Sequence, residues 1–369
     1  MNKKWVIVTI MYSFLFSMLI ILFNFAVDPL HYYRSNNNKG IYWSEERWQL
    51  PGLAKNYNYN TMILGTSMTE NFVPSEVNAI FPGAKTLKLS LAGSSTYEQS
   101  KIARIAFNHK NVENVIWGID YTSLGKENSF TEEFPKFLYD TNKINDLKYL
   151  LNITTTKYSI TSILYNISPN LVDKASPIIS LNDYPETDLN RLNYWGDLFT
   201  FNKEIVLEDY YKKIKQDRDD KKELLNNFDL NRLKSNFDKN ILPIVKNNPD
   251  TEFYFYYPPY SILMNKRFYE LDPSIINNII KSREYMYSKI SNYPNAKLFD
   301  FTTDKKITFN LDNYKDTMHH SPEISEYILK SFQDDKYLIT NKKLEFFLKE
   351  YKNQIKEFSM EQIHYVIKD

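Results

Sequence analysis

Ser67, Asp316 and His319 are the residues whose types and positions could together carry out a reaction. Asp316 stands three residues before His319, and in a turn this spacing lets the carboxylate accept a hydrogen bond from one imidazole nitrogen. The other ring nitrogen is then free to act as a base. Ser67 follows Gly65-Thr66, where glycine permits a sharp turn that presents the hydroxyl. If the fold brings Ser67 to this pair, the three side chains supply a nucleophile, a base and a group that orients the base.

Composition excludes several other kinds of chemistry. The 369 residues include no cysteine, which removes thiol nucleophiles, disulfides and thiolate metal sites. None of the eight glycines stands two or five positions from another, so neither GxGxxG nor GxxxxGK occurs. The net charge of +1 provides no basic excess for binding nucleic acid. The sequence therefore predicts no nucleic-acid partner, no metal and no cofactor.

Short apolar runs alternate with longer helical patterns along the chain. The runs predict strands at 61–64, 85–89, 114–117, 251–257 and 296–300, and the helical patterns cover 97–109, 222–247, 271–292 and a segment that begins near 321. Strands that alternate with helices form a parallel sheet covered on both faces. The predicted fold class is α/β, as a flavodoxin-like three-layer α/β/α sandwich with a parallel sheet of about five strands.

A parallel sheet would bring residues together that lie far apart in the sequence. Ligands of such sheets bind beyond the carboxyl ends of the strands. Ser67 follows the first predicted strand, Gly93 the second and Asp120 the third. The loop with the Asp-x-x-His spacing follows the last strand and precedes a helix start at Ser321-Pro322. We therefore expect these positions to converge at one edge of the sheet.

The first 27 residues predict a membrane anchor. Lys3 and Lys4 precede an apolar run from Trp5 to Val27, about long enough to cross a hydrocarbon core as a helix. The positive-inside rule leaves the N-terminus in the cytoplasm and places the rest outside. The run is too long for a cleaved signal peptide. We predict a single-pass cell-membrane protein whose main domain is extracellular.

The chain divides into four predicted segments, one of which is interrupted. Residues 1–27 form the cytoplasmic tip and transmembrane anchor, 28–60 an aromatic linker, 61–335 the sheet domain and 336–369 a C-terminal helical extension. Within the sheet domain, residues 131–235 break the alternation of strands and helices. They predict a mostly helical insertion or cap.

The ordered motifs resemble those of the SGNH (GDSL-like) serine esterases and acyltransferases. The Gly-Asp-Ser block of that family corresponds to Gly65-Thr66-Ser67, its second-block glycine to Gly93, and its Asp-x-x-His block to Asp316-Thr317-Met318-His319. The third block, Gly-x-Asn-Asp, is only partly present, because Gly118-Ile119-Asp120 has aspartate where the oxyanion-hole asparagine belongs. The chain looks most similar to the membrane-anchored members, such as the teichoic-acid D-alanylation protein DltD and the alginate-type O-acetyltransferases.

The resemblance implies an acyl-enzyme mechanism with Ser67, Asp316 and His319 as catalytic residues. The backbone N–H groups of Ser67 and Gly93 would line the oxyanion hole, and Asp120 occupies the position of a third donor. Neighbouring residues are expected to contact the substrate: Thr66, Ser94, Tyr121, Tyr260 and His320. The implied substrate is an O-acyl group, acetyl or D-alanyl, on a cell-surface polysaccharide or teichoic-acid polymer. A multispanning membrane acyltransferase is the implied protein partner.

Three alternatives also fit the sequence. An esterase would remove the acyl groups that a transferase adds, with the same residues serving both directions. A catalytically inactive SGNH-like scaffold would bind a glycan or a membrane acyltransferase, and the aspartate at position 120 favours this interpretation. The third is a membrane-tethered binding module without SGNH chemistry, which the ordered motifs disfavour.

Overall fold

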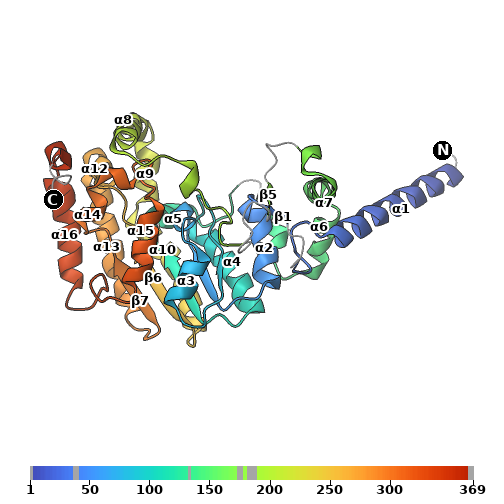
Figure 1. Ribbon diagram of the computed structural model, residues 1–369, viewed down its shortest axis with the longest axis horizontal. Helices are drawn as coiled ribbons and strands as arrows, with labels where there is room; N and C mark the ends of the chain where they lie inside the picture. Colours follow the sequence, from blue (N-terminus) through green and yellow to red (C-terminus); the bar gives the residue numbers. More distant parts are fainter. Residues whose placement is uncertain (1–2, 36–40, 132–133, 173–177, 181–188, 365–369) are drawn as a thin grey trace. The chain divides into compact units, whose positions relative to one another are not determined.

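The computed structural model describes residues 3–35, 41–131, 134–172, 178–180 and 189–364, which divide into two units (Figure 1). The anchor unit comprises Met1–Asn58 and Glu132–Asp188, and the sheet unit comprises Tyr59–Thr131 and Leu189–Asp369. The segment predicted as one insertion, 131–235, is shared between them. Its first part groups with the N-terminal residues, and the chain returns to the sheet unit at Leu189.

Five strands form one parallel sheet in the sheet unit. They are β2 (Thr61–Leu64), β3 (Thr86–Lys88), β4 (Asn114–Gly118), β6 (Glu252–Tyr257) and β7 (Ala296–Asp300), in the spatial order β3-β2-β4-β6-β7. Every neighbouring pair is parallel, and Thr61 aligns with both Thr86 and Asn114. All of β2 and most of β4 are buried, which explains why their sequences are apolar on both faces. The predicted α/β class with a five-stranded parallel sheet is confirmed.

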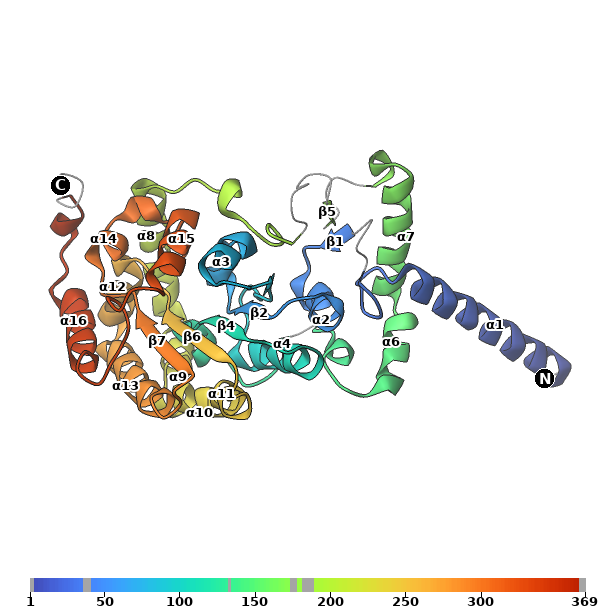
Figure 2. The ribbon, with the colours of Figure 1, turned by 60° about the horizontal axis from the view of Figure 1, so that its bottom comes forward.

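Helices of the sheet unit lie on both sides of this sheet (Figure 2). On one side α3 (Pro74–Ile80) packs with α15 (Pro322–Ser331), and on the other α10 (Leu230–Asn240) packs with α4 (Thr96–His109) and α13 (Pro273–Ile290). Further helices of this unit are α5 (Tyr121–Gly125), α8 (Lys203–Asp219), α9 (Lys221–Asn227), α11 (Leu242–Asn247), α12 (Ile262–Leu271), α14 (Lys305–Thr308) and α16 (Leu344–Glu357).

The helix predicted at 222–247 is divided into α9, α10 and α11. Asp229 accepts hydrogen bonds from the backbone N–H groups of Asn231 (3.0 Å) and Arg232 (3.1 Å), so it begins a helix and does not continue one. Pro243 stands in the first turn of α11, a position that suits proline. A similar break separates α12 from α13, where Asp272 is the N-cap and Pro273 the first helical residue.

The anchor unit combines a long helix with short elements. It contains α1 (Lys3–Val27), α2 (Glu46–Asn56), α6 (Asp146–Leu150) and α7 (Ile153–Ile167), and β1 (Ile41–Trp43) pairs antiparallel with β5 (Ile178–Ser180). The linker predicted at 28–60 is therefore structured where it is described, whereas its residues 36–40 lie outside the described part. Close packing orders this segment. A Cβ at Gly52 would lie 2.0 Å from the Leu30 carbonyl oxygen, so only glycine allows α2 to approach the backbone at Leu30 so closely.

The apolar N-terminal helix predicted from the sequence is present as α1. Within the described ranges it is the one helix long and apolar enough to cross a membrane, with a mean hydropathy of 2.6 in its most apolar window. Its 25 residues give a length of about 37 Å at 1.5 Å per residue. A hydrocarbon core is about 30 Å thick, so length and composition both suit a membrane span.

Arg283, a buried residue of α13, connects the sheet to the C-terminal helix α16. Its Nη1 lies 3.3 Å from Asp300 Oδ2 and donates a hydrogen bond of 2.9 Å to Thr302 Oγ1. The guanidinium also lies over two aromatic rings, 4.5 Å from the centroid of Tyr257 and 4.0 Å from that of Tyr351. One cation thus links the ends of β6 and β7 to α16.

Replacing Arg283 with methionine should lower the free energy of unfolding by about 3–5 kcal/mol, because the buried Asp300 would lose its opposite charge and keep only the hydrogen bonds from Thr302. Denaturant unfolding followed by circular dichroism measures this change. Lys281→Met, at an exposed position of the same helix, should change stability by less than about 0.5 kcal/mol. Equal stability of the two variants would contradict the role given to Arg283.

Candidate functional site

The structure brings Ser67, His319 and Asp316 together in one hydrogen-bonded chain. Ser67 Oγ lies 2.8 Å from His319 Nε2, and His319 Nδ1 lies 2.7 Å from Asp316 Oδ2. An ionised carboxylate can only accept, so Nδ1 carries the proton and Nε2 accepts from the serine hydroxyl. All three residues belong to the sheet unit. Their arrangement is that of a nucleophile, a base and an orienting group.

Asp316 is held ionised by its hydrogen bonds. Burial raises the pKa of this carboxyl. The His319 ring and the backbone N–H groups of His319 and Met318 lower the pKa by more than burial raises it. The net result is a pKa well below the ordinary value for aspartate. Oδ1 accepts from the N–H of Met318 at 2.7 Å and of His319 at 2.8 Å. The carboxylate therefore fixes the turn that brings the ring to its other oxygen.

Contacts from distant segments hold the loop between Asp316 and His319. Asp209 of α8 accepts hydrogen bonds from the backbone N–H (2.9 Å) and the hydroxyl (2.7 Å) of Thr317. Ser261 Oγ, at the start of α12, donates to the Thr317 carbonyl at 2.7 Å. Hydrogen bonds thus hold Thr317 at its backbone N–H, its hydroxyl and its carbonyl. These contacts limit the freedom of the histidine that follows.

The turn after β2 places Ser67 at the carboxyl end of the sheet. Gly65 has a φ of +150°, and a Cβ there would lie 2.6 Å from Thr69 Cγ2. The residue that follows, Thr66, donates from Oγ1 to Asp120 Oδ2 at 3.1 Å and so joins the turn to the end of β4. Ser67 then begins a short 3₁₀ turn, Ser67–Thr69, and remains partly exposed.

Two backbone N–H groups near the serine remain available as donors. Among the described residues, neither the N–H of Ser67 nor that of Gly93 donates a hydrogen bond. Gly93 is exposed and has a φ of +58°, a conformation that favours glycine. The ammonium of Lys126 donates to the Gly93 carbonyl, which fixes the orientation of this residue. Lys126 also lines a hollow of about 310 Å³ beside it.

Asp120 is a helix cap and cannot act as a donor. Its Oδ1 accepts from the backbone N–H of Thr122 at 2.7 Å, at the N-terminus of α5, and its Oδ2 accepts from Thr66. The side chain is buried. A carboxylate in this position holds the nucleophile turn against α5, and it offers an oxyanion no hydrogen bond.

Four of the residues predicted to contact substrate are buried: Thr66, Ser94, Tyr121 and Tyr260. Ser94 Oγ accepts from Gln99 at 3.0 Å, and Tyr121 donates to Asn265 at 2.8 Å. The rings of Tyr121 and Tyr260 pack with centroids 4.8 Å apart. The prediction that these side chains bind substrate is not supported, because their surfaces face the core.

His320 is also buried, and it takes no part in the hydrogen bonds that join Ser67, His319 and Asp316. Its Nδ1 donates to the Ser321 carbonyl at 3.1 Å, and in the described part of the chain its Nε2 has no hydrogen-bond partner. Desolvation by burial lowers the pKa of His320 to about 4. The ring therefore remains neutral at physiological pH. Of the two adjacent histidines, only His319 meets Ser67.

Trp195 contacts both Ser67 and His319, and no sequence motif marks these contacts. Its indole Nε1 donates to the Ser67 carbonyl at 3.3 Å. Its ring meets the His319 ring edge to face, with centroids 5.6 Å apart. On the same indole lies the ammonium of Lys315, 4.1 Å from the ring centroid. A signal for these contacts is absent from the sequence because they join residues more than 100 positions apart.

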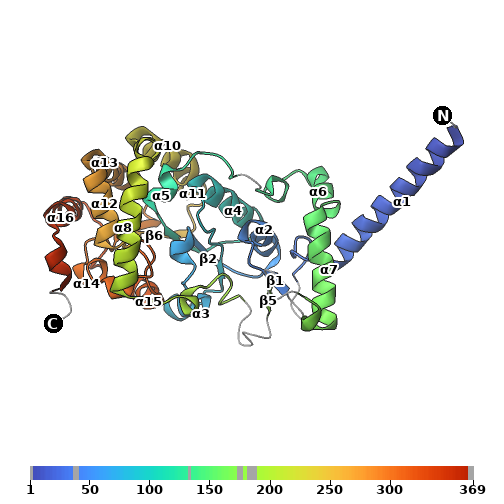
Figure 3. The same ribbon diagram turned by 90° about the horizontal axis from the view of Figure 1, so that it is seen from above.

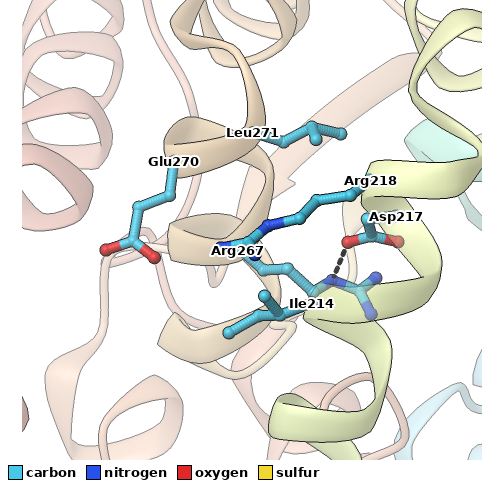
Figure 4. A pocket seen from close by; sticks show the side chains of 6 residues that line it. All are labelled: Ile214, Asp217, Arg218, Arg267, Glu270 and Leu271. Carbon is cyan, nitrogen blue, oxygen red and sulfur yellow. Dashed lines mark ion pairs between the residues drawn. The ribbon is translucent and has the colours of Figure 1, made fainter.

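A separate cavity of about 100 Å³ lies between α8 and α12 (Figure 4). Its lining residues are Ile214, Asp217, Arg218, Arg267, Glu270 and Leu271. Arg267 Nε lies 2.8 Å from Asp217 Oδ2, so these two charges pair with each other. No residue of the triad lines this cavity, and it takes no part in the arrangement around Ser67.

Comparison with protein-family models and with curated proteins found no relative. Among the residues that the structure describes, no group of three or more histidine, aspartate and glutamate side chains could hold a metal ion. The chemistry of the site is therefore argued from the geometry around Ser67.

Replacing His320 with glutamine should make the protein less sensitive to acid. A folded-state pKa of about 4 lies below the ordinary value of about 6.5. The unfolded chain thus binds a proton that the folded chain excludes, and stability falls as the pH drops from about 6.5 to about 4. The wild type should lose roughly 3 kcal/mol more than the variant between pH 7 and pH 4.

Denaturant unfolding at the two pH values measures this difference. His109→Gln, at an exposed position at the end of α4, is the matched control and should keep the acid sensitivity of the wild type. If His320→Gln also kept it, proton exclusion at His320 would not be its cause.

Proposed function

We propose that the protein is a membrane-anchored serine acyltransferase or esterase that acts on O-acyl groups of a cell-surface polysaccharide or teichoic-acid polymer. The observation that carries this proposal is the hydrogen-bonded chain from Ser67 through His319 to Asp316. The available N–H groups of Ser67 and Gly93 add an oxyanion site. Acyl transfer needs these parts together: a nucleophile, a base and donors for the oxyanion.

The strand order supports an SGNH-like fold. Numbered by their occurrence in the sheet, the strands follow the order 2-1-3-4-5, which is that of flavodoxin-like doubly wound sheets. We propose a three-layer α/β/α sandwich of this kind. Ser67 follows the first strand of the sheet, and the loop with His319 follows the last. Both then lie at the carboxyl edge of the sheet, where the resemblance to SGNH enzymes also places its catalytic blocks.

The proposed reaction has two steps. In the first, His319 Nε2 takes the hydroxyl proton of Ser67 as Oγ attacks the carbonyl carbon of an acyl donor. The N–H groups of Ser67 and Gly93 stabilise the oxyanion, each by about 3 kcal/mol. The bond to the leaving oxygen then breaks, and His319 returns the proton to the leaving alcohol. Asp316 stabilises the charged imidazolium that forms between these events.

The second step releases the acyl group from Ser67. A hydroxyl group of the polymer, or a water molecule, gives its proton to His319 and attacks the acyl carbon. The Ser67 oxygen leaves and regains a proton from His319. A polymer hydroxyl makes the protein a transferase, and water makes it an esterase. A multispanning membrane acyltransferase is the proposed partner that supplies the acyl group.

An inactive scaffold is the second candidate function. The observation that favours it is Asp120, which caps α5 where the resemblance calls for an oxyanion donor. Such a scaffold would bind a glycan or a membrane acyltransferase without forming an acyl-enzyme. The two candidates differ in whether Ser67 is reactive.

A fluorophosphonate probe should label wild-type protein at Ser67, and Ser67→Ala should remove all labelling because the nucleophile is lost. Asp316→Asn should slow labelling by about 10⁴-fold, since the imidazole loses the carboxylate that sets its tautomer. Mass spectrometry and labelling rates provide the measurement. Ser288→Ala, on the exposed surface of α13, is the control and should label like the wild type. An unreactive wild type would favour the scaffold.

The proposed orientation places the sheet unit outside the cell, because Lys3 and Lys4 precede α1. Protease added to intact protoplasts should then digest the sheet unit, as measured by immunoblotting. A cytoplasmic marker protein must survive the same treatment. Protection of the sheet unit until the membrane is permeabilised would reverse the proposed orientation.

A further inference from the structure

Helix α7 of the anchor unit exposes an apolar face. Ile153, Ile160, Ile163 and Ile167 are between 39% and 72% exposed. At 100° per residue these positions fall on one side of the helix, so they form a continuous stripe. Exposed apolar residues occur singly on most soluble proteins, whereas a contiguous patch marks an interaction surface.

The opposite face of α7 is polar and buried. Thr155, Ser159 and Ser162 face the interior of the anchor unit together with Tyr158. A helix on the surface of a soluble protein has the reverse arrangement, with its apolar stripe toward the core. Its reversal on α7 indicates that the outer face meets a medium less polar than water.

Hydrogen bonds join α7 and α6 to the end of α1. Asn24 donates from Nδ2 to the Leu150 carbonyl (2.8 Å) and to Thr156 Oγ1 (2.9 Å), and its Oδ1 accepts from Ser159 (2.8 Å). One turn further on, Asp28 accepts from the Tyr149 hydroxyl at 3.0 Å. The junction of α6 and α7 is thereby fixed to the last turn of the apolar helix.

This attachment sets the depth of α7 relative to a membrane. Asn24 lies three residues before the end of α1 at Val27, about 4.5 Å along the axis. If Lys3 and Lys4 hold the start of α1 at one membrane surface, the excess of about 7 Å over a hydrocarbon core places its last turn in the headgroup region of the other. Figures 2 and 3 agree that α7 crosses the end of α1 and does not run alongside it. A helix so placed lies along the membrane surface.

The same surface continues over α6 with a basic fringe. Ile144, Leu147 and Leu151 are exposed beside α6, and Lys143, Lys148 and Lys157 are exposed among these apolar side chains. Lysines at the margin of an apolar surface extend toward lipid headgroups and favour anionic ones. We call the exposed apolar residues of α6 and α7, with these lysines, the α6–α7 face.

Acidic residues near this face are already engaged. Asp146 accepts from the Tyr32 hydroxyl at 2.9 Å. Asp140 accepts from the backbone N–H of Asn142 at 2.8 Å and from Asn145 Nδ2 at 2.7 Å. Three lysines against these two carboxylates give residues 140–167 a net charge of +1.

We propose that the α6–α7 face lies in the interface of the bilayer that α1 spans, with anionic phospholipid as its partner. The inference rests on the proposed membrane span and is independent of the proposed chemistry. Continuity with α1 favours lipid over a second copy of the chain, because the membrane meets this face as soon as α1 is inserted. The anchor unit is then held by a span and an interfacial helix together.

Spin labels can measure the depth of this face, because the chain has no cysteine of its own. Ile160→Cys, Phe14→Cys in α1 and Lys212→Cys on the exposed surface of α8 each give one labelled site. The labelled full-length proteins are reconstituted in vesicles of phosphatidylcholine and phosphatidylglycerol. Collision with oxygen, which concentrates in lipid, is then compared with collision with a water-soluble nickel chelate.

The label at Ile160 should meet oxygen several-fold more often than nickel, as the label at Phe14 does, while Lys212 shows the opposite preference. Nickel access at Ile160 equal to that at Lys212, with Phe14 in lipid, would overturn the proposal. Dipolar broadening at Ile160 that disappears on dilution with unlabelled protein would also overturn it, in favour of a second copy. Nickel access at Phe14 would instead refute the membrane span.

Discussion

The carboxylate of Asp316 holds the histidine ring and the loop that carries it at the same time. One oxygen accepts from the His319 ring and the other from two backbone N–H groups. Because one carboxylate fixes both, displacement of the Asp316 side chain would release the ring and the loop together. Asp209 and Ser261 then hold Thr317 between them. The position of Nε2 beside Ser67 depends on this small network, and the proposed chemistry depends on that position.

The sequence was most informative where the determinants are local. The Asp-x-x-His spacing, the glycine before Ser67 and the apolar strands act within a few residues, and the structure has each of them in the predicted place. Contacts between distant segments left no such pattern. Trp195 beside Ser67 and Asp209 beside Thr317 are 128 and 108 positions from their partners. The division of residues 131–235 between two units is likewise set by packing, which no local pattern encodes.

Asp120 affects the electrostatics of the proposed site. An asparagine could direct an N–H group at an oxyanion, whereas the carboxylate accepts from Thr66 and Thr122. The carboxylate is buried and accepts three hydrogen bonds, from the Thr66 hydroxyl and from the backbone N–H and hydroxyl of Thr122. Stabilisation of an oxyanion would then come from the backbone N–H groups alone. Lys126, which donates to the Gly93 carbonyl, keeps one of these groups oriented.

The long sequence separation between nucleophile and base has a consequence for biosynthesis. His319 lies 252 positions after Ser67, and β7 must join the sheet before its loop can form. A chain made from its N-terminus therefore contains Ser67 long before His319 has been added. On the proposed function, a chain with Ser67 but not yet His319 in place has no base for the hydroxyl and would not react with an acyl donor. The proposed reactivity would then begin only after β7, the last strand of the sheet in the sequence, has been added.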